Sequence, residues 1–272
     1  MNDDANERDP VLWRVDGDGV GHLVLNRPAA ANAIDTALAA ALVAAVQQAQ
    51  LTDQSGAIGA LLISARGPQF CAGGDIREFV ARRDDLPALI RALLDGLHPA
   101  IQALATLPLP VVSALQGPVG GAGIALALSA DLVLASPALK LRGGYSAIGL
   151  SPDLGAAWQL TRRAGAARAK HILMSNRPLT AEDCLRWGLV DELHAADALL
   201  PAAQALAATL ARGARGALAG IKRLCDDAVT MPLHAHLDAE RAALLRAAAS
   251  ADGREGVAAF IERRAPVFGG GR

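Results

Sequence analysis

Apolar and polar positions follow two different periods along this chain. Residues 11–26 alternate between apolar and polar side chains around a turn at residues 16–19. This alternation predicts a β-hairpin whose second strand covers residues 20–25. Short apolar runs of β-type residues predict four further strands. These runs are residues 57–64, 110–115, 131–135 and 139–142.

Helical periodicity occupies the intervals between the apolar runs. An Ala-rich helix is expected to begin at a cap, either Asp35 or Asn32, and to end near residue 50. The pattern of residues 78–106 is also helical, and we expect breaks near Pro87 and Pro99. The remaining predicted helices cover residues 124–129, 156–163, 166–174, 180–188 with a capping-box-like start, and nearly all of the chain beyond residue 197.

The order of these elements predicts the domain organisation. Strands alternate with helices up to about residue 200, which indicates an α/β core over residues 11–199. Only helices follow, so residues 200–272 are interpreted as a helical C-terminal extension that packs on its own core or on a neighbouring subunit. The polar residues 1–10 are expected to be disordered.

Two glycine-rich bends follow two of the predicted strands. The first is residues 69–76, Gln-Phe-Cys-Ala-Gly-Gly-Asp-Ile, and the second is residues 117–123, Gly-Pro-Val-Gly-Gly-Ala-Gly. Small residues let the backbone approach a ligand, and N–H groups at the start of a helix have no partner. Two such groups that converge on one point would hold a developing oxyanion.

Charge and cysteine content narrow the class of protein. The 272 residues include 26 Lys and Arg against 27 Asp and Glu, which argues against a general nucleic-acid binder. The cysteines Cys71, Cys184 and Cys225 show no paired spacing, and without a signal peptide this indicates a reduced cytoplasmic protein. Cys71 lies in the first bend, and we interpret it as a buried small residue rather than a nucleophile.

Three other patterns in the sequence could suggest a membrane span, a metal site or a dinucleotide-binding fold, and we favour none of these. Residues 115–136 are almost uncharged, but Pro118 and Asp131 favour a buried strand–loop–helix–strand over a membrane span. His234 and His236 are interpreted as a pair on a helix surface rather than a metal site. The second bend lacks the Gly-x-Gly-x-x-Gly register of a dinucleotide-binding fold.

Several motifs, in their order and spacing, resemble the enoyl-CoA hydratase/isomerase (crotonase) superfamily over nearly the whole chain. They are Asn26-Arg27-Pro28 with Asn32-Ala33, residues 70–76, residues 116–123 with Leu126-Ala127 and Asp131, residues 150–153, residues 179–181 with 187–190, and the tail from Glu255 to Pro266. The resemblance implies a spiral of ββα units with a helical C-terminal trimerisation region. It also implies acyl-CoA thioester substrates, no cofactor besides the CoA of the substrate, and a homo-trimer or hexamer with no nucleic acid and no membrane span.

The resemblance also assigns roles to residues of the two bends and the tail. The backbone N–H groups of Ala72 and Ala122 match the pair that holds the thioester oxygen in the family. Arg263 matches a basic residue that reaches CoA, often across a subunit contact, and Arg27 is a second candidate near the adenine. The substrate-binding positions are Arg27, Ala30, Gly73, Gly74, Asp75, Ile76, Gly121, Tyr145 and Arg263. For Asp75, bracing of the loop is favoured over chemistry.

Departures from the family pattern indicate the reaction. The two glutamates of family hydratases fall at Ala125 and Tyr145, and neither residue is a carboxylic acid. Asp153 stands where relatives that shift double bonds carry their catalytic aspartate, although it would also suit a helix N-cap.

Residues 145–160 look most like isomerases of the phenylacetate-degradation type. An acyl-CoA isomerase that uses Asp153 as acid and base is therefore expected. Hydration, thioester hydrolysis, dehalogenation and a non-catalytic acyl-CoA- or RNA-binding scaffold remain alternatives.

Overall fold

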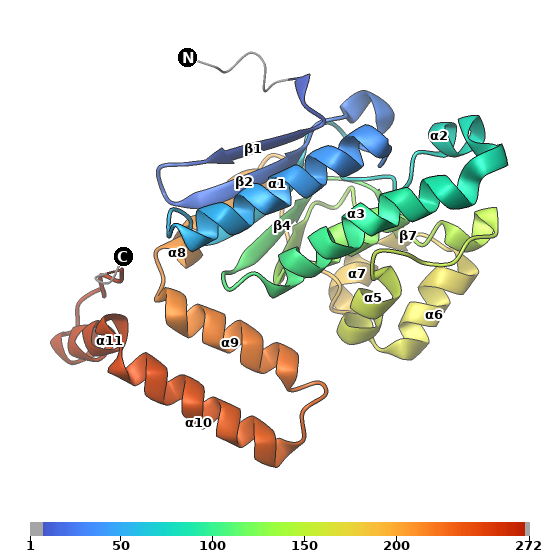
Figure 1. Ribbon diagram of the computed structural model, residues 1–272. Coiled ribbons are helices and arrows are strands. Elements are labelled where there is room, and N and C mark those ends of the chain that lie inside the picture. The colour runs from blue at the N-terminus through green and yellow to red at the C-terminus, as the bar shows by residue number, and fades with distance from the viewer. Residues whose placement is uncertain (1–7, 270–272) are drawn as a thin grey trace.

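The N-terminal alternation forms a hairpin at the edge of a six-stranded sheet (Figure 1). The computed structural model describes residues 8–269. The strand order is β1 (Val11–Val15), β2 (Val20–Leu25), β3 (Ala60–Ala65), β4 (Val111–Leu115), β6 (Leu132–Ala135) and β9 (Glu192–Leu193). In this sheet only the β1–β2 pair is antiparallel. The predicted α/β class is therefore confirmed.

Helices cover both faces of this sheet, as Figure 1 shows. On β3, Leu61 and Ile63 face the main hydrophobic core, which α1 (Thr36–Gln54) and α3 (Leu86–Thr106) complete. Leu62 faces a second cluster, which α8 (Leu199–Ala211) covers. Because both faces are buried, β3 and β4 are apolar at nearly every position.

The remaining elements of the core belong to the segments that connect the strands of the six-stranded sheet. A second, three-stranded sheet contains β5 (Val119–Gly120), β7 (Lys140–Arg142) and β8 (Leu179–Thr180). The other helices of the core are α2 (Ile76–Ala81), α4 (Ala122–Leu128), α5 (Ala156–Ala164), α6 (Ala166–Ser175) and α7 (Ala181–Arg186). Short 3-10 turns are η2 (Pro28–Ala30), η3 (Arg83–Asp85) and η4 (Tyr145–Ile148).

The helix signals in the sequence are largely confirmed, with one correction. Asp35 caps α1 through the N–H of Leu38 at 2.8 Å, and α7 begins with the expected capping box at Thr180. Pro87 stands in the first turn of α3, but the break expected at Pro99 is absent, because α3 continues through it. A proline inside a helix costs about 3 kcal/mol. Burial of four apolar side chains around it offsets that cost: Leu97, Ala100, Ile101 and Leu104.

The nearly uncharged stretch at residues 115–136 is a buried part of the core. It contains the end of β4, the bend, all of α4 and β6, and every residue of α4 is buried. The interpretation as a strand–loop–helix–strand is thus confirmed. Within residues 8–269, no helix has the length and apolarity needed to cross a membrane.

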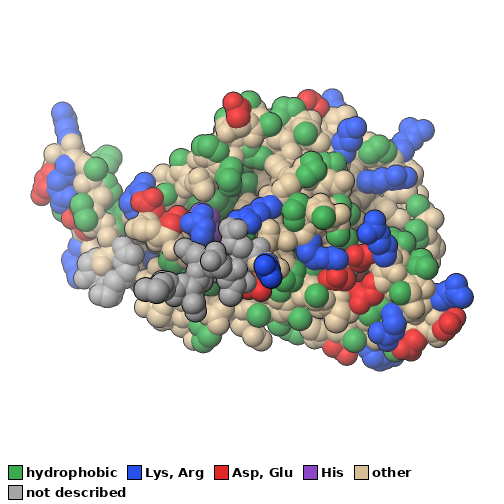
Figure 2. Space-filling model, turned by 90° about the horizontal axis from the view of Figure 1, so that it is seen from above, with side chains coloured by type: hydrophobic (Ala, Val, Ile, Leu, Met, Phe, Trp, Pro, Cys, Tyr) green, Lys and Arg blue, Asp and Glu red, His purple; other side chains and the backbone are tan. Residues whose placement is uncertain are grey.

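The boundary predicted at residue 200 falls at the start of α8, which packs on β3 and β4. Three helices follow: α9 (Arg215–Asp227), α10 (Leu233–Ala249) and α11 (Ala251–Glu262). In Figure 1, α9 lies along the lower side of the core, α10 lies below α9, and α11 projects at the left, as it also does in Figure 2. Two cations of α9 hold this C-terminal arm, residues 215–269, to the core. Arg215 pairs with Asp53 and donates to the carbonyl of Ile58 at 3.0 Å, and Lys222 pairs with Asp131 at 2.9 Å.

The predicted disorder of residues 1–10 concerns mostly residues outside the described range, since residues 1–7 lie there. The last residues of that segment are fixed to the sheet. Asn26 donates its side-chain amide to the carbonyl of Asp9 at 2.9 Å and its backbone N–H to the carbonyl of Pro10 at 2.8 Å. Asp9 and Pro10 are therefore held at the edge of the sheet.

Candidate active site

The two glycine-rich bends meet backbone to backbone, as the sequence predicted. Gly120 donates its N–H to the carbonyl of Cys71 at 2.9 Å, and Phe70 donates to Pro118 at 3.2 Å. Gly73 has φ +94°, and a Cβ there would lie 2.9 Å from the carbonyl oxygen of Gly120 and 3.3 Å from the nitrogen of Ala122. Only glycine fits such a contact at positive φ.

The N–H groups that remain free at this junction differ from the pair expected. Ala72 donates its N–H to the carbonyl of Ala31 at 3.1 Å, so the structure does not support its predicted role as an oxyanion donor. The N–H groups of Gly74 and Ala122 have no hydrogen-bond partner among residues 8–269. Gly74 and Ala122 both line the pocket described next, and Ala122 is the first residue of α4. Gly74 therefore replaces Ala72 as the first candidate donor.

A pocket of about 670 Å³ opens beside the two bends. Its wall is mainly apolar and includes Ile76 and Phe79 of α2 and Ile90 and Leu94 of α3. Gly121, with φ +50°, also lines it. An apolar cavity with a few convergent polar groups is the usual form of a small-molecule site.

Asp153 and Tyr145 form the polar centre of this pocket. Tyr145 is buried in the wall and donates its hydroxyl to Asp153 Oδ1 at 2.6 Å. Asp153 does not cap α5, because Gly155 is the N-cap and no side chain caps that helix. The alternative interpretation of Asp153 as a helix cap is therefore wrong.

The protonation states of this pair follow from their surroundings. Burial raises the pKa of Asp153, whereas the hydrogen bond from Tyr145 and the charge of His98 lower it. Burial and the neighbouring negative charge of Asp153 both raise the pKa of Tyr145. Tyr145 thus stays a hydrogen-bond donor, and Asp153 is the group that can accept and return a proton.

Two further residues that line the pocket, His98 and Arg142, were not singled out in the sequence. His98 lines it from α3, four residues after Leu94 and eight after Ile90. Arg142 lines it from the end of β7, where its Nε donates to Asn176 at 3.1 and 3.2 Å. A histidine that continues an apolar row at helical spacing is the signal that could have located His98.

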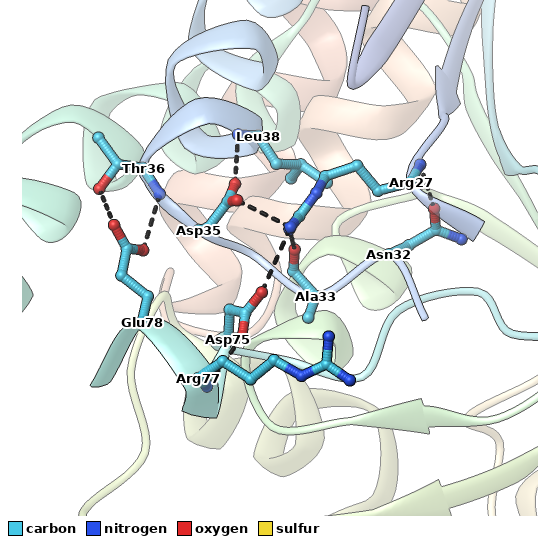
Figure 3. A network of polar contacts seen from close by, with 9 residues as sticks. All are labelled: Arg27, Asn32, Ala33, Asp35, Thr36, Leu38, Asp75, Arg77 and Glu78. Carbon is cyan, nitrogen blue, oxygen red and sulfur yellow. Dashed lines mark hydrogen bonds and ion pairs between the residues drawn. The ribbon is translucent and has the colours of Figure 1, made fainter. Parts of the chain in front are cut away.

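Arg27 and Asp75 brace the first bend instead of lining the pocket (Figure 3). The guanidinium of Arg27 pairs with Asp35 at 2.8 Å and Asp75 at 3.3 Å, and donates to the carbonyl of Ala33 at 2.6 Å. Asp75 also caps α2 through the N–H of Arg77 at 2.9 Å. These contacts are those expected of a residue that braces the loop, and Arg27 shares them with Asp75.

The remaining residues that were singled out in the sequence do not line the pocket. Gly73 lies at the contact of the bends, and Ala30 ends the η2 turn. Arg263 is exposed at the C-terminal end of α11 and does not line the pocket of this chain. Cys71 is fully buried, and burial raises the pKa of its thiol to about 12, which confirms a packing role.

The histidine pair of the C-terminal arm lies along α10. His234 is exposed, and His236 pairs with Glu240 on the same helix at 3.4 Å. In the described range, no three His, Cys, Asp or Glu side chains come together as metal ligands would. The interpretation as a helix-surface pair is consistent with this arrangement.

Comparisons with known proteins agree with this geometry. The sequence profile of the family described as "Enoyl-CoA hydratase/isomerase" matches residues 16–271. A curated relative is the 1,2-epoxyphenylacetyl-CoA isomerase of Escherichia coli (strain K12), with 37% identity over 253 residues, 93% of this chain and 95% of the relative. Another is the trans-2-decenoyl-[acyl-carrier-protein] isomerase of Streptococcus mutans, with 31% identity over 96% of this chain and 98% of the relative.

Solved structures extend the likeness to the whole fold. The crystal structure of a putative enoyl-CoA hydratase/isomerase from Mycobacterium abscessus superposes with a TM-score of 0.90 at 34% identity. The match covers 96% of this chain and 99% of that one. The spiral fold expected from the motifs is thus confirmed. On sequence, fold and pocket together, the chain belongs to the enoyl-CoA hydratase/isomerase family and is an enzyme of that family.

Proposed function

We propose that this enzyme shifts the carbon–carbon double bond of an enoyl-CoA by proton transfer through Asp153. One observation carries the proposal. Among residues 8–269, Asp153 is the only carboxylate in a pocket that also contains two free backbone N–H groups. One carboxylate suffices for isomerisation, because the proton that leaves one carbon is replaced at another.

The proposed reaction has two steps. The N–H groups of Gly74 and Ala122 donate to the thioester oxygen, and Asp153 removes a proton from the α carbon of a 3-enoyl thioester. The electron pair moves onto the thioester oxygen as an enolate, which the two donors stabilise. The double bond then re-forms between the α and β carbons as a proton is added at the γ carbon.

Hydration fits the pocket less well. Family hydratases add water across the double bond with two glutamates, one of which takes a proton from water while the other delivers a proton to carbon. Ala125 is buried in α4 without an ionisable group, and Tyr145 has a raised pKa and already donates to Asp153. Neither residue provides the second carboxylate that this addition uses in family hydratases.

The experiment is incubation of the purified enzyme with 3-enoyl-CoA and, separately, with 2-enoyl-CoA in D₂O. Products are followed by mass spectrometry. We expect interconversion of the two isomers with uptake of deuterium at the α or γ carbon. Efficient formation of 3-hydroxyacyl-CoA from 2-enoyl-CoA would instead show that the enzyme hydrates, and the proposal would fail.

Replacement of Tyr145 by Phe is expected to move the acid limb of the pH–rate profile to higher pH. The hydroxyl of Tyr145 lowers the pKa of Asp153, so its loss leaves burial to raise that pKa further. Less Asp153 is then ionised at a given acidic pH, so kcat/KM falls there severalfold relative to the wild type. The profile of kcat/KM between pH 4 and 8 measures the shift. An unchanged acid limb would separate Tyr145 from the ionisation of Asp153.

We propose further that the C-terminal arm assembles the enzyme into a homo-trimer, or a hexamer formed from two trimers. Large apolar side chains on this arm are exposed: Leu233, Leu237, Leu244, Val257, Phe260, Ile261 and Val267. The exposure of so many large apolar side chains on one arm supports their burial against other copies of the chain. In that assembly, Arg263 is proposed to reach the phosphates of CoA bound to a neighbouring subunit.

Replacement of Phe260 by Asp is expected to lower the assembled mass from three or six chains to one. Phe260 is 85% exposed in the single chain, so a charge there costs the monomer little but opposes an apolar interface. Light scattering after size-exclusion chromatography measures the mass. As a control, Arg241→Gln changes another exposed side chain of the arm and should keep the wild-type mass. A wild-type monomer would contradict the proposal.

A cytoplasmic location and independence from cofactors complete the proposal. Cys71, Cys184 and Cys225 are free cysteines, which supports a reducing compartment. A carboxylate and two backbone N–H groups supply both proton transfer and charge stabilisation, so the proposed chemistry needs no bound cofactor besides the CoA of the substrate.

A further inference from the structure

We propose that His98 is a second proton-transferring residue of the pocket, which delivers the proton at the γ carbon while Asp153 takes the proton from the α carbon. This inference rests on the proposed double-bond shift and adds a second residue to it. Asp153 and His98 come from different parts of the chain, the loop before α5 and the helix α3, and both line the same pocket.

The position of His98 follows from the period of α3. Ile90, Leu94 and His98 are spaced four residues apart and all line the pocket. Side chains at this spacing share one face of a helix. Leu97 and Ile101 are buried in the core beside this row, which fixes the rotation of α3. Along this face of α3, the pocket is therefore lined by two apolar side chains and then by the imidazole of His98.

The imidazole of His98 has both nitrogens available. It makes no hydrogen bond or ion pair with another residue of the described range, and its side chain is exposed. Three other histidines have carboxylate partners instead: His22 with Asp16, His194 with Glu192, and His236 with Glu240. A free imidazole in an otherwise mostly apolar wall can bind and release a proton without breaking an internal contact.

The other polar groups of the pocket do not compete for this role. The guanidinium of Arg142 has no acceptor for a proton, and its Nε donates to Asn176. Tyr145 gives its hydroxyl proton to the hydrogen bond with Asp153. Thus Asp153 and His98 are the two groups whose protonation can change during turnover, and the charge of His98 favours the ionised form of Asp153.

Charged groups near His98 on neighbouring elements are few. On α3, Asp95 precedes it by three residues and Arg91 by seven, and neither lines the pocket. The helix α1, which packs on α3, carries one charged residue, Asp53, and this pairs with Arg215. Asp153 and Arg142 are the other charged residues that line the pocket.

The proposed cycle is balanced in protons and electrons. Asp153 begins as a carboxylate and His98 as an imidazolium. Asp153 takes the α proton and the electron pair moves to the thioester oxygen; the enolate then re-forms the α–β double bond as His98 delivers its proton to the γ carbon. Asp153 is left protonated and His98 neutral. Transfer of one proton from Asp153 to His98 through solvent restores both.

The test uses 3-enoyl-CoA carrying two deuterium atoms at the α carbon, in H₂O, with the full-length enzyme and His98→Gln. We expect the wild type to place almost no deuterium at the γ carbon, because His98 delivers a solvent-derived proton. In His98→Gln, Asp153 must return the same isotope. Deuterium at the γ carbon should therefore rise severalfold, while kcat falls by about 10²-fold.

Two results would overturn this inference while the proposed function stands. One is a wild type that already transfers most of its deuterium from the α to the γ carbon. The other is a His98→Gln enzyme with the rate and labelling of the wild type. Absence of isomerisation by the wild type would contradict the proposed function itself, and so the two failures are distinguishable. His171→Gln is the matched control, because His171 is exposed on α6 outside the pocket and should leave rate and labelling unchanged.

Discussion

Replacement of Asp153 by Asn is expected to abolish isomerisation almost completely while the fold is retained. Asn preserves the size of the side chain and can still accept the hydrogen bond from Tyr145, which is 2.6 Å long in the wild type. It cannot take a proton from carbon. Since general acid–base catalysis contributes about 10²–10⁴ in rate, we expect kcat to fall within that range. Conversion of 3-enoyl-CoA to the conjugated isomer, followed by its ultraviolet absorbance, measures the loss.

The thermal stability of Asp153→Asn should not fall with its activity. Burial raises the pKa of Asp153, which shows that its charged form is disfavoured in the fold. A neutral amide at the same position should therefore keep or raise Tm. Retained binding of an acyl-CoA, measured by calorimetry, would further show that the pocket is intact. Loss of acyl-CoA binding together with a lower Tm would instead assign Asp153 a structural role.

Asp131→Asn is the matched control for this substitution. Burial also raises the pKa of Asp131, but its carboxylate pairs with Lys222 at 2.9 Å and accepts from the N–H of Val111 outside the catalytic pocket. We expect this variant to keep the wild-type kcat, because neither Asp131 nor Lys222 lines the catalytic pocket. An equal loss of kcat in both variants would contradict a specific role for Asp153.

The sheet was predictable because its strands carry the simplest signal. β3 and β4 are buried on both faces, and their continuous apolar runs stand out against the polar turns. The choice between Asp35 and Asn32 as the cap of α1 was not predictable from residue type. The side chain of Asn32 is used elsewhere, since its amide donates to the carbonyls of Arg66 at 3.0 Å and Gln69 at 2.8 Å.

The site was predictable to the level of its segments and not of its atoms. Spacing located both bends, and resemblance located Asp153. Which N–H of the first bend is free depends on Ala31, whose carbonyl accepts from Ala72 about forty residues away in sequence. In the same way Arg27, which was expected near the adenine of CoA, forms ion pairs with Asp35 and Asp75. Such long-range pairings leave no local pattern in the sequence.

Replacement of Gly73 by Ala is expected to lower kcat by about 10²–10³-fold, with a smaller effect on KM, because it disturbs the oxyanion donors without touching Asp153. A Cβ at Gly73 would lie 2.9 Å from the carbonyl oxygen of Gly120 and 3.2 Å from the Cα of Gly121. Both neighbours are backbone atoms and cannot rotate away. The bends must separate, which moves the N–H groups of Gly74 and Ala122 apart.

The control for this effect is Gly56→Ala, which shares the backbone strain but not the contact. Gly56 has φ +75° and a Cβ there would meet nothing within 4 Å, whereas Gly73 has φ +94° and three backbone atoms within 3.3 Å of its Cβ position. Each substitution places alanine at positive φ, at a cost of about 1–3 kcal/mol in stability. Gly56→Ala should therefore lower Tm and leave kcat unchanged. If Gly73→Ala also lowers Tm alone, the two bends serve packing only, and the charge on the thioester oxygen must be stabilised elsewhere in the pocket.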